Sequence, residues 1–167
     1  MRNITISLVA VLLLAGCGVQ IPGSQGNDQP RIKADKAAVR QYWNQVRPIL
    51  NDTARDVAGV ADVNVKVKGG NVSVGINPNA IQQAQRETQQ GLKELKQIQP
   101  PPGLGQTHRR LIKAYTQAIL ALNNFIAAVQ SGNPGQIASS VRNDLPKIQN
   151  LLNEIQTVRQ QLQQASN

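Results

Sequence analysis

Apolar residues recur every three or four positions through most of the chain after residue 34, which is the spacing of helices that bury one face. The first such stretch covers about residues 35–60. Its inward positions are Val39, Tyr42, Trp43, Val46, Ile49, Leu50, Thr53 and Val57. Pro48 lies inside this stretch, and because proline lacks a backbone N–H we expect it to kink or divide the helix.

Between residues 63 and 76 the pattern changes from helical spacing to strict alternation. Val63, Val65 and Val67 precede the turn formers at 68–71, and Val72, Val74 and Ile76 follow them. This alternation on both sides of a Gly-containing turn is typical of a β-hairpin. A lone hairpin is marginally stable in water, so we expect it to lie against the helices or an external partner.

The second helix is expected to begin at Asn77-Pro78, a capping residue followed by proline at the first helical position, and to end near Gln99. Its inward positions are Ile81, Ala84, Thr88, Leu92, Leu95 and Ile98. Residues 100–105 read Pro-Pro-Pro-Gly-Leu-Gly. Successive prolines cannot continue a helix, so the chain must reverse there.

The remaining residues predict two more long helices joined at residues 131–134. The third has its seam at His108, Leu111, Tyr115, Ala118, Leu122, Phe125 and Val129, with Ile112, Ile119 and Ile126 beside it. The fourth points Ile137, Val141, Leu145, Ile148, Leu152, Ile155, Val158 and Leu162 inward, and Pro146 should kink it near its first third. Long helices with short connections predict a mainly α fold, an antiparallel three- or four-helix bundle over residues 34–167 with a β-hairpin at about 63–76.

The first seventeen residues have the organisation of an export signal. Arg2 supplies a positive charge, Ile4 to Leu14 form an apolar run too short to span a bilayer stably, and Leu14-Ala15-Gly16-Cys17 follows. Cys17 is the only cysteine of the chain. Two alternatives remain open, an ordinary secretory signal with an accidental cysteine and an uncleaved hydrophobic anchor.

Leu14-Ala15-Gly16-Cys17 resembles the lipobox of bacterial membrane lipoproteins. The resemblance implies that residues 1–16 are a signal peptide cleaved after Gly16, and that the Cys17 thiol is diacylated, so that Cys17 begins the mature protein. Residues 17–33 are rich in turn-forming and polar residues and would then be a flexible tether. This predicts a protein anchored by palmitate-type chains at the extracytoplasmic face of the cell membrane or outer membrane.

The chain is basic, with 18 Lys and Arg against 9 Asp and Glu. Lys33, Lys36, Arg40 and Arg47 fall at helical offsets that would align them on one side of the first helix. Such a stripe contacts anionic lipid headgroups or anionic wall polymers, or it is simply a solvated helix face. Nucleic acid is not a predicted partner, because no basic residues interleave with aromatic stacking residues.

The sequence offers little material for catalysis. His108 is the only histidine, the glutamates form neither a Glu-x-x-His nor a His-Glu-x-x-His pattern, and no serine has an identifiable base. We therefore predict no enzyme activity, no metal site and no cofactor. For His108 two interpretations stand, a ligand-contacting or pH-sensing residue and a seam residue bonded to a backbone carbonyl of the proline turn.

The run 98–102, Ile-Gln-Pro-Pro-Pro, followed by His108 and a long amphipathic helix, is also similar to a pattern in small helical-bundle lipoproteins of bacteria that have no assigned activity. The expected function is a lipid-anchored, non-catalytic interaction or accessory module of the cell envelope, with an envelope protein or anionic envelope surface as partner. The alternative is a small-ligand-binding lipoprotein with a pocket between helices near Trp43, Tyr115 and His108.

Overall fold

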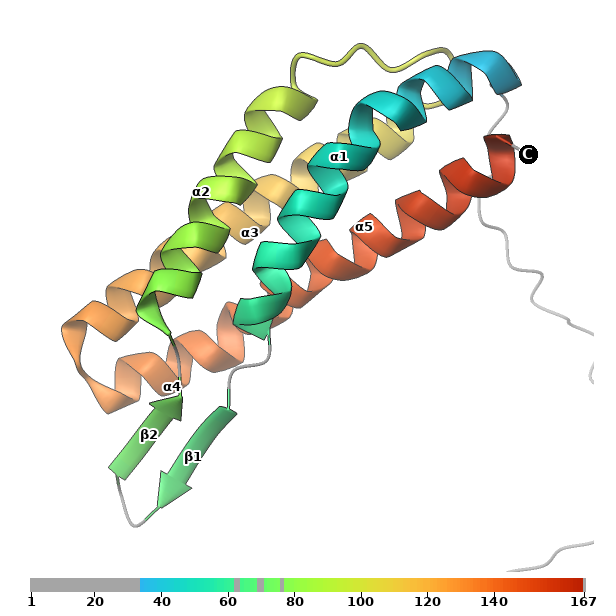
Figure 1. Cartoon of the computed structure of the whole chain (residues 1–167). Helices are drawn as coiled ribbons and strands as arrows, with labels where there is room; N and C mark the ends of the chain where they lie inside the picture. Colours follow the sequence, from blue (N-terminus) through green and yellow to red (C-terminus); the bar gives the residue numbers. More distant parts are fainter. Residues whose placement is uncertain (1–33, 62–63, 69–70, 76, 167) are drawn as a thin grey trace, which may run out of the picture. The chain divides into compact units, whose positions relative to one another are not determined.

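The computed structural model describes residues 34–61, 64–68, 71–75 and 77–166 of the chain. Its elements, in chain order, are α1 (Lys36–Ala61), β1 (Asn64–Lys68), β2 (Asn71–Gly75), α2 (Pro78–Leu95), α3 (Gly105–Ser131), α4 (Pro134–Asn143) and α5 (Leu145–Ser166) (Figure 1). The predicted signal segment, Cys17 and the tether lie outside the described residues. Within the described residues, no helix combines the length and the apolarity that crossing a bilayer requires.

The four long helices each have two long neighbours. α1 packs against α2 and α5, and α3 packs against the same two helices, so α1 and α3 lie diagonally opposite (Figure 1). One apolar cluster fills the space between them, with Tyr42, Tyr115 and Phe125 among its largest enclosed side chains. The prediction of a mainly helical bundle is confirmed.

α1 begins at a side-chain cap and continues past its proline. The carboxylate of Asp35 accepts hydrogen bonds from the backbone N–H groups of Ala37 and Ala38, at 2.9 and 3.1 Å. All eight predicted inward positions of this helix are buried. The predicted division at Pro48 does not occur, since α1 is one helix from residue 36 to 61. Pro48 is exposed, and so is Asn44, whose carbonyl has no N–H partner at Pro48.

α3 buries a wider face than its predicted seam. Three alanines, Ala114, Ala121 and Ala128, are buried beside the large residues. The isoleucines at 112, 119 and 126 are only partly buried. Small alanine side chains let neighbouring helices approach closely, and the isoleucines cover the flanks of the contact.

The last predicted helix is in fact two helices. α4 ends at Asn143 and α5 begins at Leu145, one residue before Pro146. Pro146 has no N–H to donate to the preceding turn, so the hydrogen bonds of α4 cannot continue through it. The inward positions predicted for this segment are wrong in part, because Ile137, Val141 and Leu145 are half-buried while Ser140 and Asp144 are buried.

α3 and α4 are joined by a short connection that changes the chain direction. Gly132 adopts a left-handed conformation with φ 62°, as is common for glycine at the end of a helix. The side chain of Asn133 then accepts hydrogen bonds from the N–H groups of Gly135 and Gln136, which caps α4. This sequence of a left-handed glycine and an asparagine cap places α4 back against α3.

Between α1 and α2 the chain forms two short strands. β1 pairs antiparallel with β2, with Val65 opposite Val74 and Val67 opposite Val72. β2 lies beside α4. Val63 and Ile76, the outermost positions of the alternating pattern, lie outside the described residues.

Candidate functional site

His108 forms a buried polar contact with Tyr42. The Tyr42 hydroxyl lies 2.9 Å from His108 Nδ1, and the two rings meet edge to face with centroids 5.9 Å apart. Tyr42 is 2% exposed and His108 is 5% exposed. Burial lowers the pKa of His108, and a backbone hydrogen bond with Leu95 opposes that shift. Burial raises the pKa of Tyr42 far above its ordinary value, so the phenol donates and a neutral imidazole accepts.

This contact joins α1 to α3 near the end of α2. Of the two interpretations of His108, the geometry favours the seam residue, because its Nδ1 already has a partner inside the core. The predicted bond to the proline turn is wrong, since the backbone hydrogen bond is with Leu95 at the end of α2. A neutral, enclosed imidazole is well suited to packing and poorly placed to meet a ligand from solvent.

Tyr115 lies two helical turns further along α3, roughly 10 Å from His108 by the rise of an α-helix. Its hydroxyl is fully enclosed and makes no hydrogen bond of ordinary geometry. Burial raises the pKa of Tyr115 far above its ordinary value, the nearby Thr53 hydroxyl offsets part of the rise, and the Glu94 carboxylate adds to it. The phenol therefore stays protonated.

Gly91 on α2 makes room for this tyrosine. A Cβ atom added at Gly91 would lie 2.8 Å from Tyr115 Cε1 and 2.9 Å from Thr53 Oγ1. Contacts this short do not occur in folded proteins without displacement of a neighbour. Among the described glycines, Gly91 has the closest neighbours. Helices α1, α2 and α3 therefore approach one another closely here, at Thr53, Gly91 and Tyr115.

Trp43 is 8% exposed on α1 and belongs to the core. Trp43, His108 and Tyr115, which the sequence groups around a pocket, do not line the three pockets described for the bundle. His108 is paired with Tyr42, and Tyr115 is packed against Gly91. The largest of these three pockets lies elsewhere in the described part of the chain.

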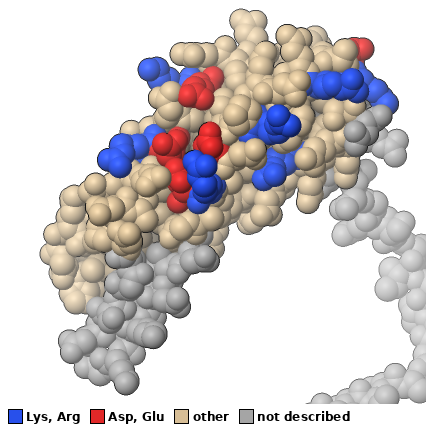
Figure 2. Space-filling model, viewed as in Figure 1, with Lys and Arg blue, Asp and Glu red and all other residues tan. Residues whose placement is uncertain are grey.

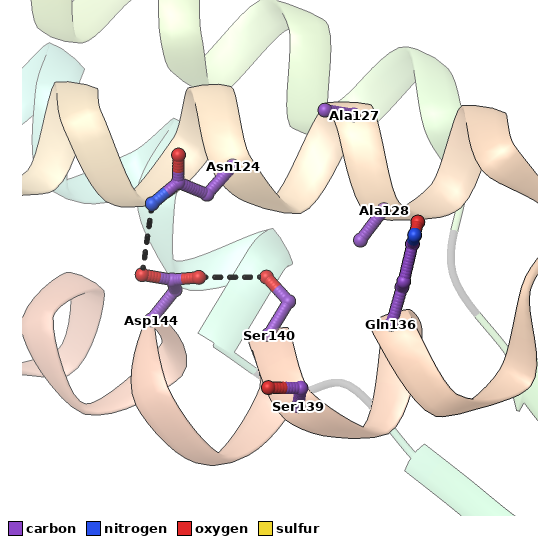
Figure 3. A pocket seen from close by; sticks show the side chains of 7 residues that line it. All are labelled: Asn124, Ala127, Ala128, Gln136, Ser139, Ser140 and Asp144. Atoms are coloured by element: carbon purple, nitrogen blue, oxygen red, sulfur yellow. Dashed lines mark hydrogen bonds between the residues drawn. The ribbon is translucent and has the colours of Figure 1, made fainter.

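This pocket lies between the second half of α3 and α4, has a volume of about 330 Å³ and is open to solvent (Figure 3). Its lining consists of Asn124, Ala127, Ala128, Gln136, Ser139, Ser140 and Asp144. The two alanines are too small to fill the space between the helices, and amides, hydroxyls and one carboxylate surround them. None of these residues was a predicted site residue.

Asp144 organises the polar side of the pocket. Ser140 Oγ donates to Asp144 Oδ2 at 2.8 Å, and Asn124 Nδ2 donates to Oδ1 at 3.3 Å (Figure 3). Lys147 Nζ also donates to Oδ1, at 3.0 Å. Burial alone would raise the pKa of Asp144, but the hydrogen bonds from Lys147, Ser140 and Asn124 outweigh it and lower the pKa below its ordinary value. The carboxylate is therefore ionised, and its charge is balanced by Lys147.

The pocket has the chemistry of a binding site for neutral polar groups. The Ser140 hydroxyl donates a hydrogen bond to the Asp144 carboxylate, and Ser139 accepts a hydrogen bond from Asn143 at 3.2 Å. His108 is sixteen residues before Asn124 on the same helix, roughly 24 Å away, and cannot serve either serine as a base. Amides and hydroxyls arranged in this way hydrogen-bond peptide or hydroxyl groups without activating them.

The helix segments that form most of the pocket contain no charged residue. Residues 114–141, the second half of α3 and most of α4, contain no Asp, Glu, Lys, Arg or His. Leu120, which is 59% exposed, shares one side of α3 with Asn124 and Ala127 because these positions are four and seven residues apart. We call Leu120, Asn124, Ala127, Gln136 and Ser139 the neutral surface. The signal for it, a run of 28 residues without charge, is visible in the sequence.

The two ends of the bundle differ in charge. We define the basic end as residues 34–47, 91–113 and 154–166, and the far end as residues 48–61, 78–90 and 114–153. The basic end contains Lys36, Arg40, Arg47, Lys93, Lys96, Arg109, Arg110, Lys113 and Arg159 against three acidic residues, a net charge of +6. The helices of the far end contain four basic and four acidic residues, a net charge of zero, and strand β1, which extends from the same end, adds Lys66 and Lys68. In Figure 2, acidic side chains gather over the middle of α1 and α2, and mainly Lys and Arg lie toward the start of α1.

The predicted basic stripe is part of this larger charged region. Lys36, Arg40 and Arg47 are exposed on α1, and Lys33 lies outside the described residues. Arg40 Nη2 donates to the carbonyl of Ser166 at 3.1 Å, which ties the start of α1 to the end of α5. The described residues contain no group of three His, Cys, Asp or Glu side chains that could hold a metal ion.

Comparison of the chain with protein-family models, with curated proteins and with solved structures finds no match.

Proposed function

We propose that the chain is a lipid-anchored, non-catalytic interaction module of the cell envelope, exposed on the extracytoplasmic side of its membrane. The observation that carries the proposal is Leu14-Ala15-Gly16-Cys17, which ends an apolar run and contains the only cysteine. Two or more acyl chains on Cys17 hold a protein firmly at a bilayer, whereas one chain holds it only marginally.

The neutral surface supports contact with a protein partner. The centres of protein–protein interfaces are depleted of charged residues and contain enclosed apolar side chains. Leu120 is the exposed large apolar side chain of the described residues, and an open pocket with hydrogen-bonding groups lies on the same side of α3. The edges of the β1–β2 hairpin are a second surface that could receive a strand of a partner.

The proposal is tested by crosslinking in cells and purification of the lipidated protein from its own membranes. We expect a stoichiometric envelope protein to copurify, and we expect Cys17→Ala to lose both the lipid mass and the partner. Leu120→Arg should lose the partner while the protein stays folded and anchored. Gln89→Arg, at an exposed position of α2, is the matched control and should retain it. A saturating crosslink survey without any partner would contradict the proposal.

A second candidate function is the binding of a small neutral polar ligand in the pocket between α3 and α4. Its volume of about 330 Å³ is at the lower end of the range of small-molecule sites. Native mass spectrometry of the protein purified from its own membranes should then detect a bound small molecule that Ala127→Phe, at the lining of the pocket, displaces. If the protein has the same mass in both forms, apart from the substitution, this candidate is excluded.

A further inference from the structure

The positive charge of the basic end surrounds that end of the bundle and is not confined to one face. Arg40 comes from α1, Lys93 from α2, Arg109 from α3 and Arg159 from α5. Every long helix therefore contributes at least one cation. An approaching flat anionic surface would meet positive charge from all four sides of the bundle.

The acidic residues at this end are already engaged. Asp35 caps α1, Glu94 accepts a hydrogen bond from the amide of Gln90 at 2.6 Å, and Glu154 is held by Arg110 at 2.7 Å. By contrast, Lys93 and Lys96 are exposed and have no ion pair within the described part of the chain. The excess charge is thus available to an external anion, and at physiological salt it acts over about 8 Å.

The chain that leads from Cys17 enters the bundle at this same end, because α1 begins at Lys36. Sixteen residues, 18–33, separate Cys17 from the first described residue. Fully extended they would span at most about 60 Å, so the membrane is within reach of the basic end. A tethered surface needs few contacts to dock, since the tether keeps its local concentration high.

We infer that the basic end is a docking surface for anionic phospholipid headgroups, on which the bundle stands with the neutral surface directed away from the membrane. The inference rests on the proposed lipid anchor. Each Lys or Arg close to such a surface strengthens binding about fivefold, corresponding to roughly 1 kcal/mol. The helices of the far end have no net charge and strand β1 adds two lysines, so the attraction at that end is weaker.

The test places the lipidated full-length protein in vesicles of phosphatidylcholine, with or without one third phosphatidylglycerol. A water-soluble, amine-reactive reagent then labels the lysine side chains, and mass spectrometry gives the labelling rate of each lysine. We expect phosphatidylglycerol to slow labelling of Lys93, Lys96 and Lys113 severalfold and to leave the far-end Lys147 unchanged. Equal rates in the two vesicles at all four lysines would overturn the inference.

Charge variants make the test specific. Lys96→Gln combined with Arg109→Gln should weaken docking about 25-fold, at fivefold for each side chain, and return Lys93 and Lys113 to their rates on phosphatidylcholine. Arg86→Gln combined with Arg142→Gln removes the same charge from exposed positions of the far end and should leave the protection intact. If both pairs reduce protection equally, net charge and not the basic end governs binding, and the inference fails.

Failure of the anchor has a separate signature. In that case the Cys17 peptide lacks a lipid mass and the protein enters neither vesicle, whatever the lysine rates in solution. A wall polymer is distinguished by adding soluble polyphosphate to phosphatidylcholine vesicles. Protection by polyphosphate together with none by phosphatidylglycerol would overturn the lipid assignment in favour of an anionic polymer.

Discussion

The basic end and the far end distribute charge in opposite ways between surface and interior. The basic end has a net surface charge of +6, but its buried polar contact, Tyr42 with His108, is neutral. The helical ranges of the far end have no net charge, yet they bury an ionised carboxylate at Asp144. Surface cations remain hydrated and need no partners, whereas a buried carboxylate needs donors from several elements. The far end is therefore the more demanding part of the fold to specify.

The largest effect is expected where the two ends meet, at Gly91. Gly91→Ala should lower the free energy of unfolding by about 3 kcal/mol, since the new methyl group overlaps Tyr115 and Thr53. Urea unfolding followed by circular dichroism measures the change. Gly59→Ala is the control, because a Cβ atom there meets nothing within 4 Å. That substitution should be neutral or stabilising. A single transition in both variants would show that the two ends unfold together.

At the far end, Asp144→Ala should lower the free energy of unfolding by about 2 kcal/mol, since Ser140, Asn124 and Lys147 lose a charged acceptor. The pKa of Asp144 is lower in the folded state than in the unfolded chain. Its stabilisation is therefore present above the unfolded pKa of about 3.9 and is lost as the pH falls below it. Unfolding at pH 7 and pH 3 should show a smaller difference between variant and parent at pH 3. An equal difference at both values would contradict this account.

At the basic end, Tyr42→Phe should lower the free energy of unfolding by about 1 kcal/mol, because His108 Nδ1 loses its donor. The folded pKa of His108 lies below its ordinary value of 6.5. The unfolded chain therefore binds the proton more readily, and the contribution of His108 to stability is present above pH 6.5 and declines as the pH falls below it. His108→Phe should remove that decline between pH 7 and pH 5. A decline that persists unchanged would assign it to other groups.

The smallest effect is expected at the surface of the basic end. Glu154→Gln breaks the ion pair with Arg110, whose side chains are 20% and 34% exposed, and should lower the free energy of unfolding by about 0.5 kcal/mol. Unfolding at low salt and in 0.5 M salt checks it, because screening should reduce the difference. A larger effect, insensitive to salt, would mean that Arg110 acts by packing and not by charge.

Sequence periodicity predicts the local part of this fold well. It identifies the inward positions of α1 and the seam of α3, since these depend on spacing within one helix. It favours Leu92 on α2, whereas Gly91 is the buried position, because the reason for Gly91 lies in Tyr115 of another helix. It also predicts apolar inward positions throughout α4, where the structure buries Ser140 and Asp144.

The candidate site was harder to predict for the same reason. Tyr42 and His108 are 66 residues apart, and Asn124 and Asp144 are 20 residues apart on different helices. No local pattern indicates that these side chains meet. The grouping of Trp43, Tyr115 and His108 followed from residue type alone, and the structure instead gives each its own packing role. The uncharged run at 114–141 was the available signal for the neutral surface.

The length of the long helices sets the distance between the two ends of the bundle. α3 extends over 27 residues, about 40 Å at 1.5 Å per residue, from the basic end to the turn at Gly132. On a membrane the bundle would work as a fixed spacer, with a partner received at a height set by helix length. The first and last described helices, α1 and α5, start and end at the basic end, where Arg40 donates a hydrogen bond to the carbonyl of Ser166. A fluorescent tag intended to report on the partner therefore belongs at the turn near Gly132, because one attached after residue 166 would report on the lipid.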